Sequence, residues 1–97
     1  MFIKRKHGEA LAVKLSTGEW YIMYIKVDDG FRGRGIGTKL MQRILKECGR
    51  PVYLLATSEL GGDLVRLVQF YERFGFRTIE RHQSEFLDYN ANMVLES

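Results

Sequence analysis

The chain has 97 residues, of which 45% are hydrophobic and 28% charged, with one cysteine, one proline and a formal charge of +3. We expect one domain, residues 1–97, and this composition excludes a disordered chain. No apolar run approaches the roughly 20 residues that a membrane-spanning helix needs, and no signal-peptide pattern opens the sequence. The lone Cys48 excludes an internal disulfide and a cysteine-rich zinc site, so we expect a cytoplasmic protein with no membrane partner.

The charge balance is basic, with 15 lysines and arginines against 12 aspartates and glutamates. Such an excess favours an anionic partner, either a nucleotide, a phosphorylated cofactor or a nucleic acid. An ordinary soluble surface has the same balance, so charge alone does not choose between these.

Three strands are predicted in the first 27 residues, over Phe2–Lys6, Glu9–Leu15 and Trp20–Val27. Each is rich in β-branched, aromatic or alternating apolar residues. Gly8 separates the first two strands, and the segment from Ser16 to Glu19 separates the second from the third. Tight turns of this kind join antiparallel strands.

A helix with one apolar face follows, because Ile36, Leu40, Met41, Ile44 and Cys48 recur at helical spacing. Gly49 stands where a glycine in the left-handed conformation ends many helices, and Pro51 follows where a helix cannot continue.

The second half predicts a strand over residues 51–57, a helix from Leu64 to Phe74 with Asp63 as N-cap, and two strands, Phe76–Glu80 and Met93–Leu95. The polar residues 81–92 are expected to hold a turn. The order βββαβαββ predicts an α+β fold with two helices and a mixed, mostly antiparallel sheet.

The most informative segment runs from Val27 to Thr38 and reads VDDGFRGRGIGT, between a predicted strand and a predicted helix. Glycines bring backbone N–H groups close to a ligand, and the first turn of a helix offers unpaired N–H groups at the positive end of its dipole. Arg32 and Arg34 add charge-assisted contacts for a polyphosphate. The pattern therefore predicts a phosphate-binding loop.

Other readings of this segment fit less well. Leu40 stands where a dinucleotide fingerprint needs its third glycine, and Gly37-Thr38-Lys39 does not have the Walker A order. A nucleic-acid-binding Arg-Gly tract is long and repeated, whereas this one is single. A glycine-rich turn without a ligand stays open.

Two motifs carry a resemblance to a known family. Arg32-x-x-Gly35-x-Gly37 between a strand and a helix resembles the acetyl-CoA pyrophosphate loop of the GCN5-related N-acetyltransferases, or GNAT family. The segment FYERFGF, Phe70 to Phe76, is similar to the Tyr-x-x-x-Gly-Phe helix end of that family. The resemblance covers Trp20 to Leu95 and implies a truncated acyl-CoA N-acyltransferase fold with acetyl-CoA as co-substrate.

The resemblance also implies roles for individual residues. The strand before the loop would offer backbone groups of Ile25, Lys26 and Val27 to the pantetheine arm, and an amide near Ile25 or Val27 would stabilise the oxyanion. The pyrophosphate would be held by the backbone amides of the loop, at Arg32, Gly33, Arg34, Gly35, Ile36, Gly37 and Thr38.

Tyr71 matches the general acid of the family, which protonates the departing CoA thiolate, and a phenol with a pKa of about 10 stays protonated at pH 7. The alternative interpretation is that Tyr71 is an aromatic core residue on the apolar face of the helix. Arg73 matches a position that approaches the cofactor phosphates, although an exposed helix arginine is an equal reading.

The sequence departs from the family pattern in three places. Many members have a glutamate on the strand before the loop, but Trp20–Val27 contains no carboxylate, so Glu19, Glu59 or a water relay are left as general base. Leu64 stands where an asparagine commonly opens the second helix. The first strand and two helices of the family are missing, which leaves the acceptor site open and an apolar surface that a homodimer would cover.

The expected function is transfer of an acetyl group from acetyl-CoA to a primary amine, on a small molecule or a protein, by direct attack in a ternary complex. The alternative is a non-catalytic acetyl-CoA-binding or protein-interaction module. His7 and His82 lie far apart without a second ligand pattern, so no metal is expected. A nucleic-acid partner is not expected either, because too few basic residues converge.

Overall fold

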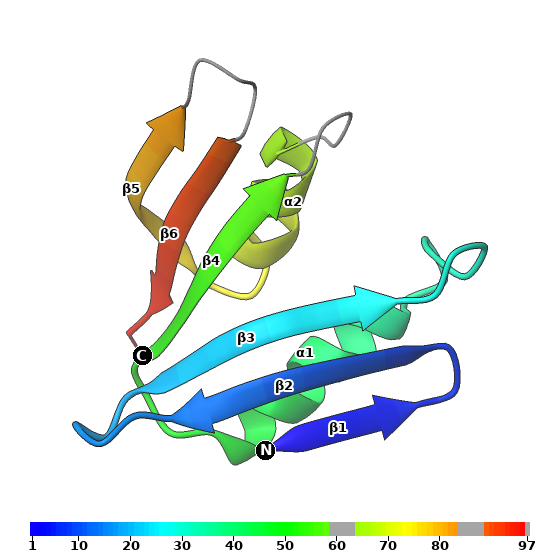
Figure 1. Cartoon of the computed structure of the whole chain (residues 1–97), viewed down its shortest axis with the longest axis horizontal. Coiled ribbons are helices and arrows are strands. Elements are labelled where there is room, and N and C mark those ends of the chain that lie inside the picture. Colours follow the sequence, from blue (N-terminus) through cyan, green and yellow to red (C-terminus); the bar gives the residue numbers. More distant parts are fainter. Residues whose placement is uncertain (59–63, 84–88, 97) are drawn as a thin grey trace. The chain divides into compact units, whose positions relative to one another are not determined.

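The computed structural model describes residues 1–58, 64–83 and 89–96, and the chain divides into two units, Met1–Arg50 and Pro51–Ser97 (Figure 1). The order of elements is the predicted βββαβαββ, and it confirms the α+β class with two helices and mostly antiparallel strands. The bounds are β1 Phe2–Arg5, β2 Gly8–Lys14, β3 Trp20–Val27, α1 Ile36–Glu47, β4 Val52–Ser58, α2 Leu64–Glu72, β5 Arg77–Gln83 and β6 Tyr89–Leu95.

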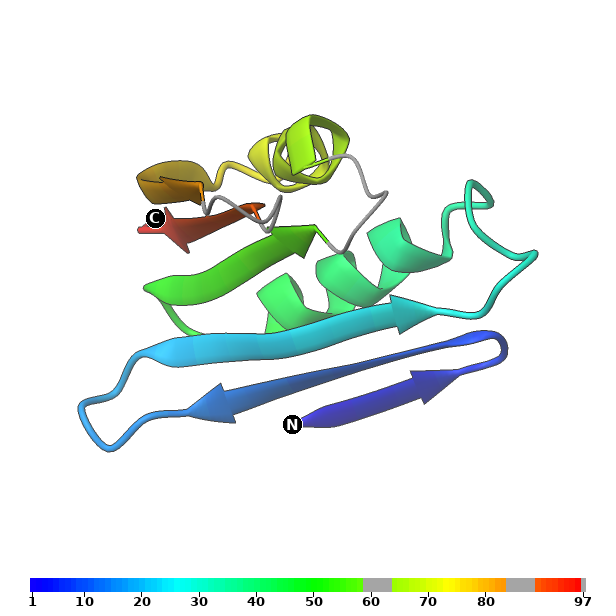
Figure 2. The same cartoon turned by 45° about the horizontal axis from the view of Figure 1, so that its top comes forward.

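In the first unit, β2 lies between β1 and β3, and both pairings are antiparallel. The helix α1 covers one face of these strands, as Figure 2 shows most clearly. The alternation of apolar residues along the strands supplies that face, with Ile3, Ala10, Ala12 and Ile22 buried. The helix contributes Leu40, Met41 and Ile44, all fully buried. Burying each such side chain contributes about 1.5–3 kcal/mol of hydrophobic free energy, which fixes α1 on the strands.

The close approach of α1 to β2 depends on Gly8. A Cβ atom at this position would lie 2.7 Å from Ile36 Cγ2 and 3.2 Å from Leu40 Cδ1. Real side chains do not approach so closely, so only glycine lets the first turn of α1 pack against the start of β2. Gly8 thereby helps to set where the helix begins.

A β-bulge interrupts the pairing of β2 with β3. Leu11 is opposite Tyr24 and Ala12 is opposite Ile22, so Met23 has no partner on β2. A bulge removes one residue from the hydrogen-bonding pattern and increases the local twist of the strand. Met23 is also 55% exposed.

The end of α1 differs from the prediction at Gly49. Cys48 leaves the helix with extended backbone at φ −89° and ψ 140°, and Gly49 is not among the glycines with positive φ. The guanidinium of Arg50 instead donates hydrogen bonds to the carbonyl oxygens of Leu45, at 3.3 Å, and Cys48, at 2.9 Å. A charged side chain therefore satisfies the carbonyls at the helix end, and no left-handed glycine is needed.

In the second unit, β6 lies between β4 and β5, and both pairings are antiparallel. The helix α2 packs against these strands, and its Leu64 and Tyr71 are buried. Val52, Leu54 and Met93 are also buried in this unit, as the apolar patterns of the strands predict. Ala91, in the segment that was predicted to hold a turn, is buried too. The helix ends at Glu72, two residues before the predicted Phe74, and Gly75 follows it in the left-handed conformation with φ 97°.

The last two strands are longer than predicted. The predictions Phe76–Glu80 and Met93–Leu95 are too short, because β5 runs over Arg77–Gln83 and β6 over Tyr89–Leu95. Residues 81–83 and 89–92 pair within the antiparallel ladder, where backbone hydrogen bonds form whatever the side chains are. The predicted N-cap Asp63 lies outside the described residues.

Candidate functional site

The loop between β3 and α1 has three glycines in left-handed conformations, Gly30, Gly33 and Gly35, with φ of 85°, 79° and 79°. Other residue types rarely adopt this backbone, so the glycines are required by the shape of the loop. A Cβ atom at any of the three would meet no heavy atom within 4 Å. The space above the loop backbone is therefore open to a ligand.

The first turn of α1 offers its amides to the same space. Gly35 is the N-cap residue and makes no side-chain capping hydrogen bond. The Lys39 N–H donates to the Gly35 carbonyl at 3.1 Å, so the amides of Ile36, Gly37 and Thr38 precede the first hydrogen bond of the helix. The first turn contains no acidic residue. A bound anion would complete this helix start and be favoured by the helix dipole.

The two loop arginines are exposed and lie beside the glycines. A guanidinium nitrogen of Arg32 lies 3.6 Å from the carboxylate of Asp29, and both side chains are well exposed. The Arg34 guanidinium lies 5.3 Å from the centroid of the Phe31 ring. An exposed ion pair and an exposed cation–π contact each contribute at most about 1 kcal/mol, so either guanidinium can be redirected to a phosphate at small cost.

The three residues predicted to meet the pantetheine arm are the last three of β3, directly before the loop. Ile25, Lys26 and Val27 pair with Ala10, Glu9 and Gly8 of β2. The side chains of Ile25 and Val27 are half-buried, whereas Lys26 is exposed. The first unit thus brings all predicted cofactor residues from Ile25 to Thr38 together in one strand, loop and helix start.

Tyr71 lies in the last turn of α2, in the second unit, and is 8% exposed. Its ring packs edge-on against Phe70 at 5.3 Å and Phe76 at 6.1 Å between centroids. Burial raises the pKa of its phenol above the ordinary value. The hydroxyl therefore keeps its proton at neutral pH, which suits a proton donor as well as a packed aromatic residue.

Arg73 follows the end of α2 and is exposed. Its guanidinium lies 5.9 Å from the centroid of the Phe70 ring, within cation–π distance. Tyr71 and Arg73 belong to the second unit, whereas the loop belongs to the first. Both residues are therefore described only by their contacts within the second unit.

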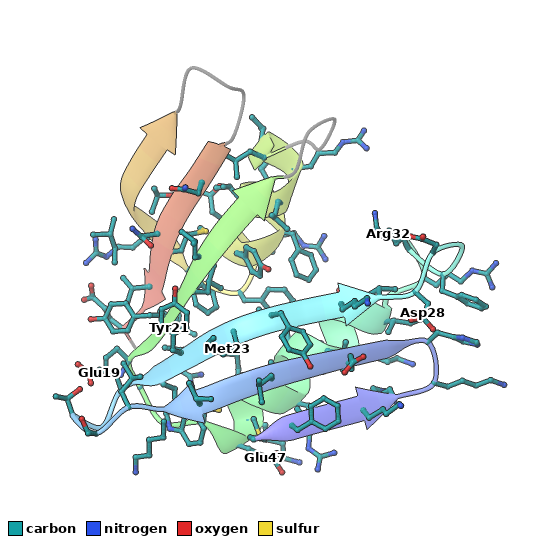
Figure 3. The ribbon with its side chains drawn as sticks, viewed as in Figure 1. Glu19, Tyr21, Met23, Asp28, Arg32 and Glu47 are labelled. Atoms are coloured by element: carbon teal, nitrogen blue, oxygen red, sulfur yellow. The ribbon has the colours of Figure 1, made fainter. Side chains whose placement is uncertain are left out.

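The carboxylates considered as a general base have different surroundings. Glu19 precedes β3, at the opposite end of this strand from Asp28 and Arg32 (Figure 3). The Thr17 hydroxyl donates to its carboxylate, and this hydrogen bond is the main cause that lowers the pKa of Glu19. Glu59 lies outside the described residues. A lowered pKa makes Glu19 a weaker base, which argues against this role.

A contact between His7 and Phe31 of the loop was not predicted from the sequence. The His7 ring stacks on Phe31 with centroids 3.5 Å apart and an interplanar angle of 8°. The pairing of β2 with β3, which sets Gly8 opposite Val27, brings the turn that holds His7 beside a loop more than twenty residues further along the chain. No local pattern in the sequence signals such a contact.

The described residues contain no group of three or more His, Cys, Asp or Glu side chains that could hold a metal ion. Across the same part of the chain, no helix has the length and apolar character needed to cross a membrane.

Comparison with known families identifies the class of the chain. The model of the acetyltransferase (GNAT) domain matches residues 3–78, more than three quarters of the sequence. The chain therefore belongs to the GNAT family, as the loop and helix-end motifs predicted. The match begins near the start of β1, earlier than the motifs alone indicated. No curated protein matches the chain.

Solved structures share the fold at low sequence identity. Naa50 from Arabidopsis thaliana, in complex with the bisubstrate analogue CoA-Ac-MVNAL, is 24% identical with a TM-score of 0.71, over 93% of this chain and 65% of that one. Ard1 from Thermoplasma volcanium is 25% identical with a TM-score of 0.74, over 92% and 62%. An aminoglycoside 6′-N-acetyltransferase complexed with coenzyme A is 17% identical with a TM-score of 0.72, over 92% and 65%.

These structures confirm the fold class, and two of the three hold CoA or a CoA analogue. The chain spans less than two thirds of the length of each of these three structures.

Proposed function

We propose that the protein is an N-acetyltransferase that moves the acetyl group of acetyl-CoA to a primary amine. The observation that carries this proposal is the loop from Asp28 to Gly35, with three left-handed glycines over open space and an uncapped helix start. Family membership supplies acetyl-CoA as the phosphorylated ligand for this loop. In the proposal, the amides from Arg32 to Thr38 hold the pyrophosphate, with the guanidinium groups of Arg32 and Arg34 beside it.

The proposed reaction is a direct attack in a ternary complex. The nitrogen of the neutral amine attacks the thioester carbonyl, a C–N bond forms, and the C–S bond breaks to release the CoA thiolate. The nitrogen loses one proton and the thiolate gains one. Backbone amides fixed along β3 would stabilise the negative charge on the carbonyl oxygen, which contributes about 3–4 kcal/mol in other acyl-transfer enzymes.

The backbone N–H that would donate a hydrogen bond to this oxygen is proposed on β3. Ile25 and Val27 stay candidates for it, as the sequence indicated. Met23 joins them, because the bulge removes it from pairing with β2.

Tyr71 is the proposed general acid for the leaving thiolate. The support is its match to the family motif and the raised pKa of its buried phenol, which keeps the proton available. Arg73, two residues after Tyr71 and just beyond the end of α2, is proposed to approach the phosphates of the cofactor. To do so, its guanidinium would give up a cation–π contact with Phe70.

The proton of the attacking amine is proposed to leave through water. Glu19 is a poor candidate for the base because the Thr17 hydrogen bond lowers its pKa. The eight residues of β3, roughly 26 Å of strand, separate it from the loop.

The alternative function is a non-catalytic acetyl-CoA-binding or protein-interaction module. The observation that favours it is the absence of a carboxylate on β3. Both functions need cofactor binding, and only the enzyme releases free CoA thiol.

A thiol-release assay with acetyl-CoA separates the two. The panel of amines should include a polyamine, an aminoglycoside and a peptide with a free N-terminus, because the neighbours named above act on different acceptors. We expect thiol release with at least one class and an acetylated product by mass spectrometry. Acetyl-CoA binding without release for any amine would favour the module instead.

A homodimer in the cytoplasm is proposed as the working form. Phe2 and Met23 are 54% and 55% exposed, and Tyr24 is 39% exposed, all in the strands of the first unit. Phe2 and Tyr24 both flank Leu11 across the strands, on the face opposite α1. Exposed apolar patches of this kind commonly mark an interface.

A further inference from the structure

The turn between β1 and β2 contacts both ends of the glycine loop. His7 meets the start of the loop at Asp28 and Phe31, and Gly8, the next residue, admits Ile36 at the start of α1. The turn and the loop belong to the same unit, Met1–Arg50. The adjacent residues His7 and Gly8 therefore contact the loop at its start and the helix directly after its end.

His7 makes three different contacts with residues 28–31. Its carbonyl accepts a hydrogen bond from the Asp28 N–H at 2.9 Å. Its Nδ1 lies 3.7 Å from Asp28 Oδ2, and its ring stacks on Phe31 at 3.5 Å. The Phe31 N–H in turn donates to the Asp28 carbonyl at 3.0 Å, which closes a turn at the entry of the loop.

The backbone of His7 is itself unusual. It is the one non-glycine among the described residues with a positive φ, at 69°. Histidine is among the side chains that tolerate this conformation better than most. The left-handed backbone points the half-buried ring toward Phe31 while β2 continues with Gly8.

The contacts continue from Phe31 to the proposed phosphate ligands. The Arg34 guanidinium lies 5.3 Å from the centroid of the Phe31 ring, and Gly33 and Gly35 flank Arg34 in the chain. His7 is therefore linked through one aromatic ring to the basic part of the loop. Asp28, Asp29, Arg32 and Arg34 are the charged groups that the loop itself presents here.

We propose that His7 is a positioning residue for cofactor binding: its stack on Phe31 holds the glycine loop in the conformation that binds the pyrophosphate. This inference rests on the proposed function. His7 touches no reacting atom and acts through Phe31 and Asp28.

The physical reason is the conformational freedom of glycine. A loop with glycines at positions 30, 33 and 35 has many accessible backbone states, and ordering it on binding weakens the apparent affinity. If only a fraction of the free protein has the binding conformation, the apparent Kd rises by the inverse of that fraction. The His7 stack raises that fraction before the cofactor arrives.

A double-mutant cycle on cofactor binding tests this inference. His7→Asn removes the ring but keeps a residue type that tolerates positive φ, and Phe31→Leu removes the other ring. We expect each variant to raise the Kd for acetyl-CoA roughly three- to tenfold, the range that one aromatic pair supports. The double variant should lose no more than either single one, because both remove the same stack. Phe31→Tyr keeps the stack and should retain wild-type affinity.

Two further readouts separate positioning from general stability. The kcat at saturating acetyl-CoA should be unchanged in His7→Asn, since the stack acts on binding only. Amide hydrogen exchange of residues 31–35 in the free protein should become faster, whereas Arg43→Ala, on the exposed side of α1, should leave both the Kd and this exchange unchanged.

Failure of the positioning role of His7 can be distinguished from failure of the proposed function. A wild type that does not bind acetyl-CoA would contradict the function, and the exchange measurement would still decide whether His7 orders the loop. Unchanged exchange and Kd in His7→Asn, or losses that multiply in the double variant, would overturn the positioning role.

Discussion

The side chain of Tyr71 has two roles in this account, packing in the core and the proposed proton donation. The ring is buried against Phe70 and Phe76, and the hydroxyl is the only part that phenylalanine lacks. A substitution that removes the hydroxyl but keeps the ring therefore separates the two roles.

Tyr71→Phe is predicted to lower kcat by roughly 10²-fold, the lower end of the range for loss of a general acid. The KM for acetyl-CoA and the free energy of unfolding should change little, by less than about 1 kcal/mol for the latter, because the aromatic packing remains. Steady-state kinetics and thermal unfolding give both values. An unchanged kcat would reduce Tyr71 to a core residue.

The raised pKa of Tyr71 has a consequence for stability at alkaline pH. The folded state holds the phenol proton more tightly than the unfolded chain does, so the tyrosine contribution is fully present below the ordinary pKa of about 10. It is lost as the pH rises through and above that value. Unfolding followed between pH 8 and 11.5 should show a decline that is smaller in Tyr71→Phe, and parallel curves for the two proteins would refute this origin.

The residues of the loop could be recognised from the sequence because their function requires their chemistry. Glycines with positive φ, flanking arginines and a following amphipathic helix are each visible in one short segment. His7 could not be recognised, because its role depends on Phe31, which the pairing of β2 with β3 brings beside it. The weakness of Glu19 as a base also needed the structure, since the Thr17 hydrogen bond lowers its pKa.

At the scale of elements, the start of α1 depends on how closely the helix approaches β2. The contact of Gly8 with Ile36 fixes this approach and so the place of the amides that precede Lys39. The apolar face of α1 then holds the helix through Leu40, Met41 and Ile44.

Gly8→Ala is predicted to destabilise the protein by about 1–3 kcal/mol, because the added Cβ would lie 2.7 Å from Ile36 Cγ2 and force the helix start to shift. Acetyl-CoA affinity should fall with it. Gly49→Ala is the matched control, since its Cβ would meet no atom closer than 4.0 Å and its φ is not positive. Chemical denaturation and calorimetry measure both effects, and equal stability of the two variants would contradict the packing argument.

Helices and strands that bury one apolar face could be predicted from the sequence. Strand ends that are set only by backbone pairing were predicted less well. The spacing of Ile36, Leu40 and Ile44 indicates the helix α1, and the apolar run after Pro51 indicates β4. The polar ends of β5 and β6 carry no such pattern, so the predicted strands were too short. The helix end at Gly49 was misread because Arg50, a side chain, caps the carbonyls instead.

At the scale of the whole molecule, the chain matches only part of the solved structures that share its fold. The chain spans 65% of the Naa50 structure that it matches. The description as a single domain, residues 1–97, stays a prediction, and so does the acceptor. A second copy is the proposed partner of the exposed apolar residues in the strands of the first unit.

Native mass spectrometry is predicted to show a dimer whose stability depends on the strands of the first unit. Phe2→Lys places a charge on a side chain that is 54% exposed and should shift the protein to the monomer. Val65→Lys is the control, because Val65 on α2 is equally exposed at 54%. A wild-type monomer at micromolar concentration would refute the dimer.

The central claim is that the glycine loop before α1 binds the pyrophosphate of acetyl-CoA, and titration calorimetry tests it most directly. The three proteins to compare are the wild type, Gly35→Glu and Gly18→Glu. Gly18 also has a positive φ and open space around it, but it lies in the turn between β2 and β3, away from the loop. The two variants should therefore be strained alike, while only Gly35→Glu puts a carboxylate at the helix start. We predict that the wild type and Gly18→Glu bind acetyl-CoA with similar affinity and that Gly35→Glu does not bind detectably. Absence of binding by the folded wild type, or equal binding by all three, would contradict the claim.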